Sequence, residues 1–248
     1  MDNKEFIDRA RKKIKEGLSV DDLIRKLIAF SDSLEKGENI IFEQLNDIYF
    51  LYYPEAATNL KERDRFIDVL KESCDRSSIS KKMGIPVDSM GFDLDDKELQ
   101  LLSLSINELS NISDLRKVVN DRLYEIIQKI YPNLNAVLGS EIAARIIYLA
   151  GSSRSLMLMP SSKIQVLGAE KAMFAARKKK ATPKYGVIYN HKLMLSLPDN
   201  LKGRMAKVIA AYTSVAVKTD VLSKEDKSGK IMEKMLKDVD KVRKGNGT

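Results

Sequence analysis

Apolar residues recur along most of the chain at intervals of three and four, the spacing of an amphipathic helix. The first such segment follows Ser19, which we expect to act as the N-cap because two aspartates lie in the first turn. A second segment ends at Pro54, and a third runs to Cys74 in a pattern close to a heptad, which Arg63 interrupts. Glycine and proline are scarce, which disfavours a many-turned all-β fold, so we expect an all-α fold.

Two further amphipathic segments follow an irregular region at residues 73–93. Asp95 and Asp96 open the first of them, and Ser113 is expected to cap the second, which ends before Pro132. Apolar stripes at this spacing normally pack against one another. We therefore expect residues 1–131 to form an antiparallel coiled-coil stalk or a helical bundle.

The composition changes from Leu134 onward, where small residues become frequent and charges rare. This favours a buried helix inside a compact helical domain at residues 132–222. We expect its later part to hold a helix that ends in cations, a loop with a short extended piece at Val187–Tyr189, and a packed helix from about Asp199 to Val221. The charged tail at residues 223–248 is expected to be a frayed helix or disordered.

The single cysteine and the single histidine exclude several kinds of site. One cysteine excludes an intramolecular disulfide and a multi-cysteine metal site, and one histidine excludes a histidine-rich metal centre. We expect Cys74 to be buried in the stalk and His191 to be a surface or capping residue. The sequence has no phosphate-binding loop of the P-loop type. We therefore expect no enzyme activity, no metal and no cofactor.

The sequence also shows no signal for secretion or for membrane insertion. The N-terminal stretch is charged, and the best apolar run, Ile142–Ala150, is far shorter than the roughly 20 residues of a membrane span. Together with the single thiol, this favours a cytoplasmic, reducing setting without a membrane partner.

The charges are clustered by sign. The net charge is +8, and the segment from Lys163 to Lys184 holds seven cations and one anion, whereas the segment from Asp88 to Glu125 holds nine anions and four cations. A cluster of cations is what phosphate binding requires, because counterion release grows with the number of phosphates neutralised together. The alternative is a solvated helix end whose cations interact with the helix dipole.

A face almost without side chains lies beside this basic cluster. If the helix continues at 100° per residue, Gln165, Gly168, Ala172 and Ala175 share one narrow face, which suits either close helix packing or the approach of an RNA backbone. Tyr185 and Tyr189 follow the cations. These rings either stack on RNA bases or lie partly buried with their hydroxyls at the surface.

Two motifs in this region, IQVLGAEKAMF followed by TPKYGVIY, resemble the Nop domain. That domain is shared by core proteins of box C/D guide ribonucleoproteins and by a spliceosomal tri-snRNP assembly factor of pre-mRNA processing. Upstream, IYFLYYPEAA and SMGFDL resemble stalk elements of the family, and LKGRMAKVIAAYTSVAVKTD resembles its closing helix. The resemblance spans roughly residues 40–221, and the archaeal branch is the closer likeness.

The resemblance implies a coiled-coil stalk that can self-associate, joined to a compact helical Nop domain. This domain would bind a kink-turn (box C/D-type) RNA together with a small kink-turn-binding protein of the ribosomal type. The residues that would face the RNA are Gln165, Gly168, Glu170, Lys171, Arg177, Lys178, Lys179, Lys180, Lys184 and Tyr185. Those that would lie near the protein partner are Arg145, Gly151, Ser152 and Arg154.

Archaeal core proteins of the family also carry an N-terminal α/β domain that holds the methyltransferase fibrillarin. This chain opens almost at the stalk, so we expect it to lack that domain and not to retain fibrillarin. The function expected from the sequence is a non-catalytic RNA-binding assembly module. The alternative is a helical protein–protein scaffold with no specific RNA role.

Overall fold

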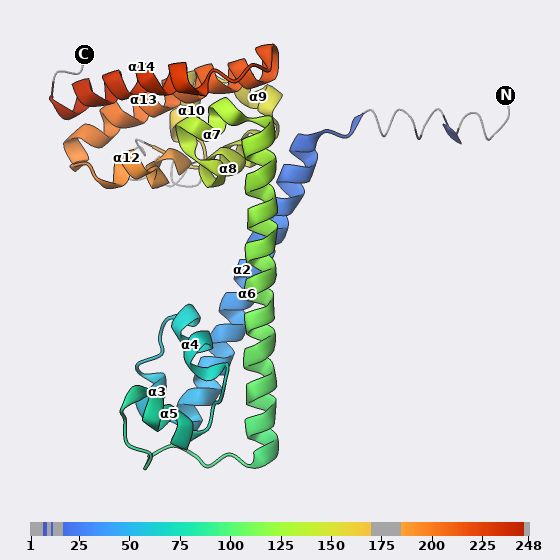
Figure 1. Ribbon diagram of the computed structural model, residues 1–248, viewed down its shortest axis with the longest axis vertical. Coiled ribbons are helices and arrows are strands. Elements are labelled where there is room, and N and C mark those ends of the chain that lie inside the picture. Colours follow the sequence, from blue (N-terminus) through green and yellow to red (C-terminus); the bar gives the residue numbers. More distant parts are fainter. Residues whose placement is uncertain (1–6, 9–10, 12–16, 170–184, 246–248) are drawn as a thin grey trace, which may run out of the picture. The chain divides into compact units, whose positions relative to one another are not determined.

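Every regular element in the described part of the chain is a helix, which confirms the all-α fold. The computed structural model describes residues 7–8, 11, 17–169 and 185–245 (Figure 1). The helices up to the middle of the chain are α2 (Val20–Tyr52), α3 (Pro54–Ala57), α4 (Arg63–Leu70), α5 (Arg76–Met83) and α6 (Asp96–Ile130). They are followed by α7 (Pro132–Leu138), α8 (Ser140–Ala150), α9 (Ser153–Leu158), α10 (Ser161–Val166), the 3₁₀-helix η1 (Val187–Asn190), α12 (Lys192–Leu195), α13 (Asp199–Lys218), the π-helix η2 (Thr219–Ser223) and α14 (Ser228–Arg243).

The chain forms two compact units. One, here called the middle unit, is Ala29–Asn120, and the other, here called the terminal unit, combines Met1–Ile28 with Asp121–Thr248. The boundaries between the units fall inside α2 and α6. None of the helices in the described ranges has the length and apolar character that a membrane span requires.

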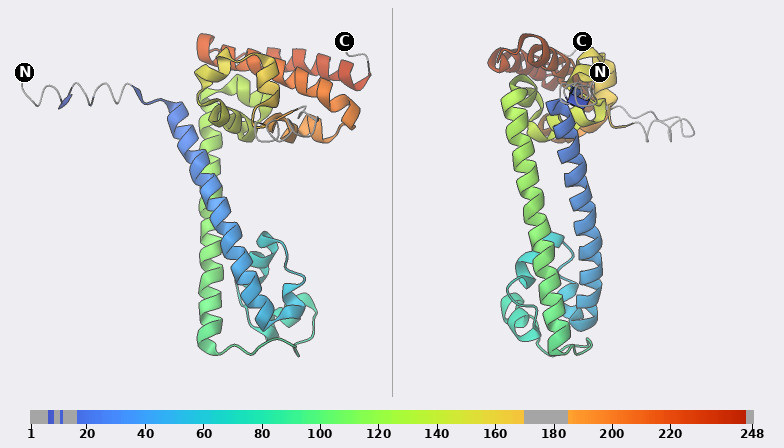
Figure 2. Two further views of the ribbon diagram at one scale, coloured as in Figure 1. Left: turned by 180° about the vertical axis from the view of Figure 1, so that it is seen from behind. Right: turned by 90° about the vertical axis from the view of Figure 1, so that its right-hand side faces the viewer.

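In the middle unit, α2 and α6 run in opposite directions, as Figure 2 shows. Ser31 on α2 donates a hydrogen bond to Asn120 on α6 (2.7 Å), and Glu38 forms an ion pair with Arg116 (2.8 Å). Helices α3, α4 and α5 pack beside them around a core rich in aromatic rings, which includes Tyr49. The antiparallel direction agrees with the sequence analysis, and the coiled-coil geometry stays a prediction.

Several helix boundaries in the middle unit differ from those expected. The helices expected on either side of Ser113 are one continuous helix, α6, and Ser113 is buried inside it, since the segment contains neither glycine nor proline. The two segments before Pro54 likewise form the single helix α2. The third segment, in contrast, is divided between α3 and α4.

The region expected to be irregular, residues 73–93, contains a helix of its own. The Asp75 carboxylate accepts a hydrogen bond from the Ser78 N–H (2.9 Å) and so caps α5. The helix ends at Gly84, whose φ of 68° is left-handed.

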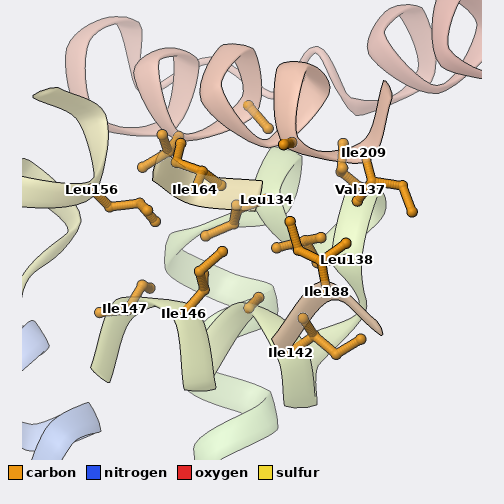
Figure 3. Packing of buried hydrophobic residues seen from close by; sticks show 14 of the residues in the cluster. Leu134, Val137, Leu138, Ile142, Ile146, Ile147, Leu156, Ile164, Ile188 and Ile209 are labelled. Atoms are coloured by element: carbon orange, nitrogen blue, oxygen red, sulfur yellow. The ribbon is translucent and has the colours of Figure 1, made fainter. Parts of the chain in front are cut away.

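The terminal unit contains a core built from many short helices (Figure 3). Helices α7, α8, α9, α10, η1 and α12 each contribute at least one buried apolar residue, and this burial, rather than length, stabilises helices of this size. The residues labelled in Figure 3 are Leu134, Val137, Leu138, Ile142, Ile146, Ile147, Leu156, Ile164, Ile188 and Ile209.

Two expectations for the terminal unit were wrong. The charged tail is not frayed over Ser228–Arg243, because Ile231, Met235, Val239 and Val242 recur at helical spacing and are buried in the core. The piece expected to be extended is η1, a 3₁₀-helix. The helix expected over Asp199–Val221 is confirmed as α13, followed by η2.

Candidate nucleic-acid interface

The segments that flank residues 170–184 are joined by their backbones. The Gly186 N–H donates to the Gln165 carbonyl (2.8 Å), and the Val187 N–H donates to the Leu167 carbonyl (2.9 Å). A Cβ on Gly186 would lie 1.9 Å from the Leu167 oxygen, so only glycine allows this approach. This arrangement, which we call the clasp, holds together the residues on either side of residues 170–184.

The bare helical face expected at Gln165 and Gly168 is not formed. Helix α10 ends at Val166, and Gly168 has a left-handed φ of 89°. A Cβ at Gly168 would also meet Leu149 Cδ1 at 3.0 Å. The spacing of 100° per residue therefore does not apply here, and Gly168→Ala is expected to strain the backbone, not to favour a helix.

Two tyrosines of the predicted RNA surface stack on each other. The rings of Tyr185 and Tyr189 are 5.0 Å apart and 10° from parallel. Lys202 on α13 places its ammonium 5.2 Å from the centre of the Tyr189 ring, and an ion pair with Asp199 (2.8 Å) raises the pKa of Lys202. The sequence analysis missed Lys202, and the only signal was its place four residues after Pro198, in the first turns of α13.

Six of the seven cations in the predicted basic segment, Lys163–Lys184, lie outside the described residues. Glu170, Lys171, Arg177, Lys178, Lys179, Lys180 and Lys184 lie outside the described residues, as do Ala172 and Ala175. Of the predicted RNA-facing residues, the structure brings Gln165, Gly168 and Tyr185 to the clasp or directly beside it.

The residues predicted near a protein partner lie at the junction of α8 and α9. Arg145 lies over the Tyr148 ring (5.9 Å), and Gly151 ends α8 with a φ of 85°. Ser152 caps α9, since its hydroxyl accepts from the Ser155 N–H (3.0 Å), and Arg154 is exposed. Gly151 and Ser152 thus have structural roles in this junction, and their contact with a partner stays a prediction.

Cys74 and His191, the single cysteine and the single histidine of the chain, both have structural roles. Cys74 is buried in the middle unit, and burial raises its pKa. His191 caps α12: its Nδ1 accepts from the Leu193 N–H (3.2 Å), and its Nε2 lies 2.9 Å from the Val137 carbonyl. Within the described ranges, no group of His, Cys, Asp and Glu side chains is arranged to hold a metal ion.

Comparison with known proteins assigns the chain to a family. A family model described as Nop, the snoRNA binding domain, fibrillarin, matches residues 30–244. The chain belongs to the Nop family. The match contains the clasp, both tyrosines and the junction of α8 and α9.

Relatives in this family are longer than the chain. An uncharacterised NOP5 family protein of Methanocaldococcus jannaschii is 30% identical over 237 residues, which cover 90% of this chain and 57% of that protein. Nucleolar protein 58 of Schizosaccharomyces pombe is 30% identical over 222 residues, which cover 84% of this chain and 44% of that protein. The chain thus spans about half the length of these relatives. Because the yeast relative is named a nucleolar protein, the cytoplasmic setting stays a prediction.

A solved structure shares the fold. The crystal structure of a fibrillarin/Nop5p complex contains a chain that matches with a TM-score of 0.61 and 22% identity. The match covers 97% of this chain and 80% of that one. At this identity the likeness establishes the fold.

Proposed function

We propose that this chain is a non-catalytic RNA-binding assembly module of a box C/D-type ribonucleoprotein. It would recognise a kink-turn RNA together with a kink-turn-binding protein of the ribosomal type. The observation that carries the proposal is the family match over residues 30–244, within which the clasp joins the residues on either side of residues 170–184.

The clasp supports the proposal because it fixes the positions of the residues that flank residues 170–184. Buried Ala169 precedes residues 170–184 in the chain, and Tyr185 follows them, next to the hydrogen bonds of Gly186. Cations on a segment anchored at both ends lose less conformational freedom on binding than cations on a free tail. The stacked pair of Tyr185 and Tyr189 adjoins this anchor and offers an aromatic surface of the kind that unstacked RNA bases contact.

A reconstitution tests the composite recognition. Kink-turn RNA is mixed with the chain in the presence and in the absence of the kink-turn-binding protein, and complexes are resolved by native gel. We expect prebound protein to raise the affinity of the chain for RNA by tenfold or more, which corresponds to about 1.4 kcal/mol of coupling. Equal affinity for naked and protein-bound RNA would contradict composite recognition, and no affinity for either would favour the scaffold alternative.

Fibrillarin is tested in the same reconstitution. The similar solved structure holds fibrillarin, and the sequence analysis predicts that this chain does not retain it. A pull-down with purified fibrillarin, which uses the fibrillarin-binding relative as the positive control, decides the point. Stable retention would show that this prediction is wrong and would leave the RNA proposal unchanged.

A further inference from the structure

A groove of about 530 Å³ lies between α13 and α14, which run side by side in the terminal unit (Figure 1). Its apolar floor includes Ala211 and Val215 on α13, and Val215 is 49% exposed. Its border on the α14 side carries three lysines, Lys227, Lys230 and Lys234. None of these residues belongs to the predicted basic segment or to the clasp.

Two of the lysines are free to meet an anionic ligand. Lys230 and Lys234 are exposed and one helical turn apart, and among the described residues neither ammonium has a carboxylate within ion-pair distance. Lys227, in contrast, pairs with Glu225 (2.5 Å). On the same helix but away from the groove, Lys237 pairs with Glu233 (2.6 Å), and it therefore provides a matched control.

The carboxylate that lines the groove is already neutralised. Asp238 accepts a hydrogen bond from the Tyr212 hydroxyl (2.8 Å) and pairs with Lys241 (2.7 Å). Lys241 and the Tyr212 hydroxyl lower the pKa of Asp238. Burial, together with the hydrogen bond to Asp238, raises the pKa of Tyr212 to about 12, so the tyrosine stays a donor at neutral pH. The same hydrogen bond fixes the half-buried Tyr212 ring in the wall of the groove.

A cation-lined groove with a fixed aromatic ring and an apolar floor is the arrangement that binds single-stranded nucleic acid. The cations contact successive phosphates, and the ring and the apolar floor contact bases. We propose that the α13–α14 groove binds a single-stranded segment of RNA, with Lys230 and Lys234 on its phosphates and Tyr212 against a base. This inference rests on the proposed function and extends it, because it gives the same RNA a second contact outside the clasp.

The experiment measures binding of a fluorescein-labelled oligouridylate of about 12 nucleotides to the full chain by anisotropy, across a range of salt concentrations. For Lys230→Gln/Lys234→Gln we expect about tenfold weaker binding at low salt. We also expect the log–log salt slope to fall by about 1.4, since each lost phosphate contact on a single strand contributes about 0.7. The control Lys237→Gln should leave affinity and slope within experimental error of the unmodified chain.

Variants of Tyr212 distinguish the contribution of stacking to RNA binding from that of charge. Tyr212→Ala should weaken binding about tenfold without changing the salt slope, because a ring neutralises no phosphate, whereas Tyr212→Phe keeps the ring and most of the affinity. Thermal melting of each variant identifies any loss that comes from unfolding. If Tyr212→Ala does not fold, the lysine pair and Tyr212→Phe still decide the proposal.

Three results would contradict the proposal that the groove binds RNA. The first is no binding of the oligouridylate, and the second is an affinity of the lysine variants equal to that of the unmodified chain. The third is binding of an acidic helical peptide in the groove in place of RNA. A parallel reconstitution with blunt-ended kink-turn RNA keeps this proposal distinct from the proposed function. The lysine variants should still assemble on that RNA, which has no single-stranded end. If the unmodified chain binds the oligouridylate but does not assemble on kink-turn RNA, the result contradicts the proposed function and leaves the groove proposal unchanged.

Discussion

The two units of the molecule bury carboxylates in different ways. In the middle unit, the Glu38 side chain is 0% exposed and forms ion pairs with Arg63 (2.8 Å) and Arg116 (2.8 Å). In the terminal unit, buried Asp21 and Asp220 have no cation among the hydrogen-bond partners that the described residues provide. Asp21 accepts from the Tyr131 hydroxyl and from the N–H and hydroxyl of Ser153, and Asp220 accepts from donors of Asn133 and Leu134.

The difference shows two ways to offset the cost of taking a charge out of water. Glu38 relies on two guanidinium groups, and these come from helices far apart in the sequence, so the ion pairs fix how α2, α4 and α6 meet. Asp220 relies on the backbone N–H groups at the start of α7, where the helix dipole also favours a negative charge. The Glu38 ion pairs join three helices, whereas Asp220 caps α7 although it is remote from that helix in the sequence.

The largest expected effect is the loss of Glu38. Glu38→Ala removes the shared carboxylate of Arg63 and Arg116, both mostly buried, and leaves Arg63 with its longer contact to Asp64 (3.4 Å), so we expect the free energy of unfolding to fall by about 3 kcal/mol. Urea unfolding followed by circular dichroism measures the change. Glu35→Ala, at an exposed position one turn earlier on α2, is the control and should change stability by less than about 0.5 kcal/mol.

A triple variant sharpens this prediction. Replacement of Glu38 by Met together with Arg63 and Arg116 by Leu removes the charges on both sides, so the cost should largely disappear. A triple variant as unstable as Glu38→Ala would show that packing, and not the uncompensated charge, accounts for the loss.

Local signals in the sequence predicted where helices begin. The Ser19 cap is confirmed, since the Ser19 hydroxyl accepts from the Asp22 N–H (3.4 Å) and the Asp22 carboxylate accepts from the Ser19 N–H (2.9 Å). Asp95 likewise accepts from the Glu98 N–H (2.9 Å) at the start of α6. Such caps involve residues three apart and are therefore visible in a single sequence. Ser113 was wrongly expected to be an N-cap because the sequence alone does not distinguish a serine inside a helix from one at the start of a helix.

Long-range contacts and positive φ angles left no such signal. Asp220 and Asn133 are 87 residues apart, and nothing near either residue indicates the pairing. Gly168 fits a helical face by spacing, yet its φ is 89°, and the segment that contains Val187 lies close to it. The motifs at the clasp were found by resemblance, whereas its geometry depends on contacts between segments on either side of residues 170–184.

The second expected effect concerns the cap of α7. Asp220→Ala removes the acceptor for the Asn133 and Leu134 N–H groups, and we expect a loss of about 2 kcal/mol because these buried donors remain unpaired. Amide hydrogen exchange at Asn133 and Leu134 should accelerate relative to the middle unit. Asp240→Ala, on the exposed face of α14, should leave both rates unchanged. Equal acceleration in both units would contradict a local cap.

The smallest expected effect is a pH dependence confined to the terminal unit. His191 is the only histidine of the chain, and burial lowers its pKa below the ordinary value of about 6.5. The unfolded chain therefore takes up the proton first, so stability is complete above about pH 7.5 and falls as the pH decreases through 6.5. Protonation of Nδ1 also removes the acceptor for the Leu193 N–H. For one group the slope cannot exceed about 1.4 kcal/mol per pH unit.

Urea unfolding between pH 5.5 and 8 measures this dependence, and hydrogen exchange assigns it to a unit. His191→Asn keeps a side-chain oxygen that can cap α12 but cannot titrate, so its stability should be flat over the same range. Because the middle unit contains no histidine, its exchange rates, corrected for intrinsic chemistry, should not respond to pH in this window. A response of equal size in the middle unit would show that the two units unfold together and that the contrast between their buried charges has no separate effect on stability.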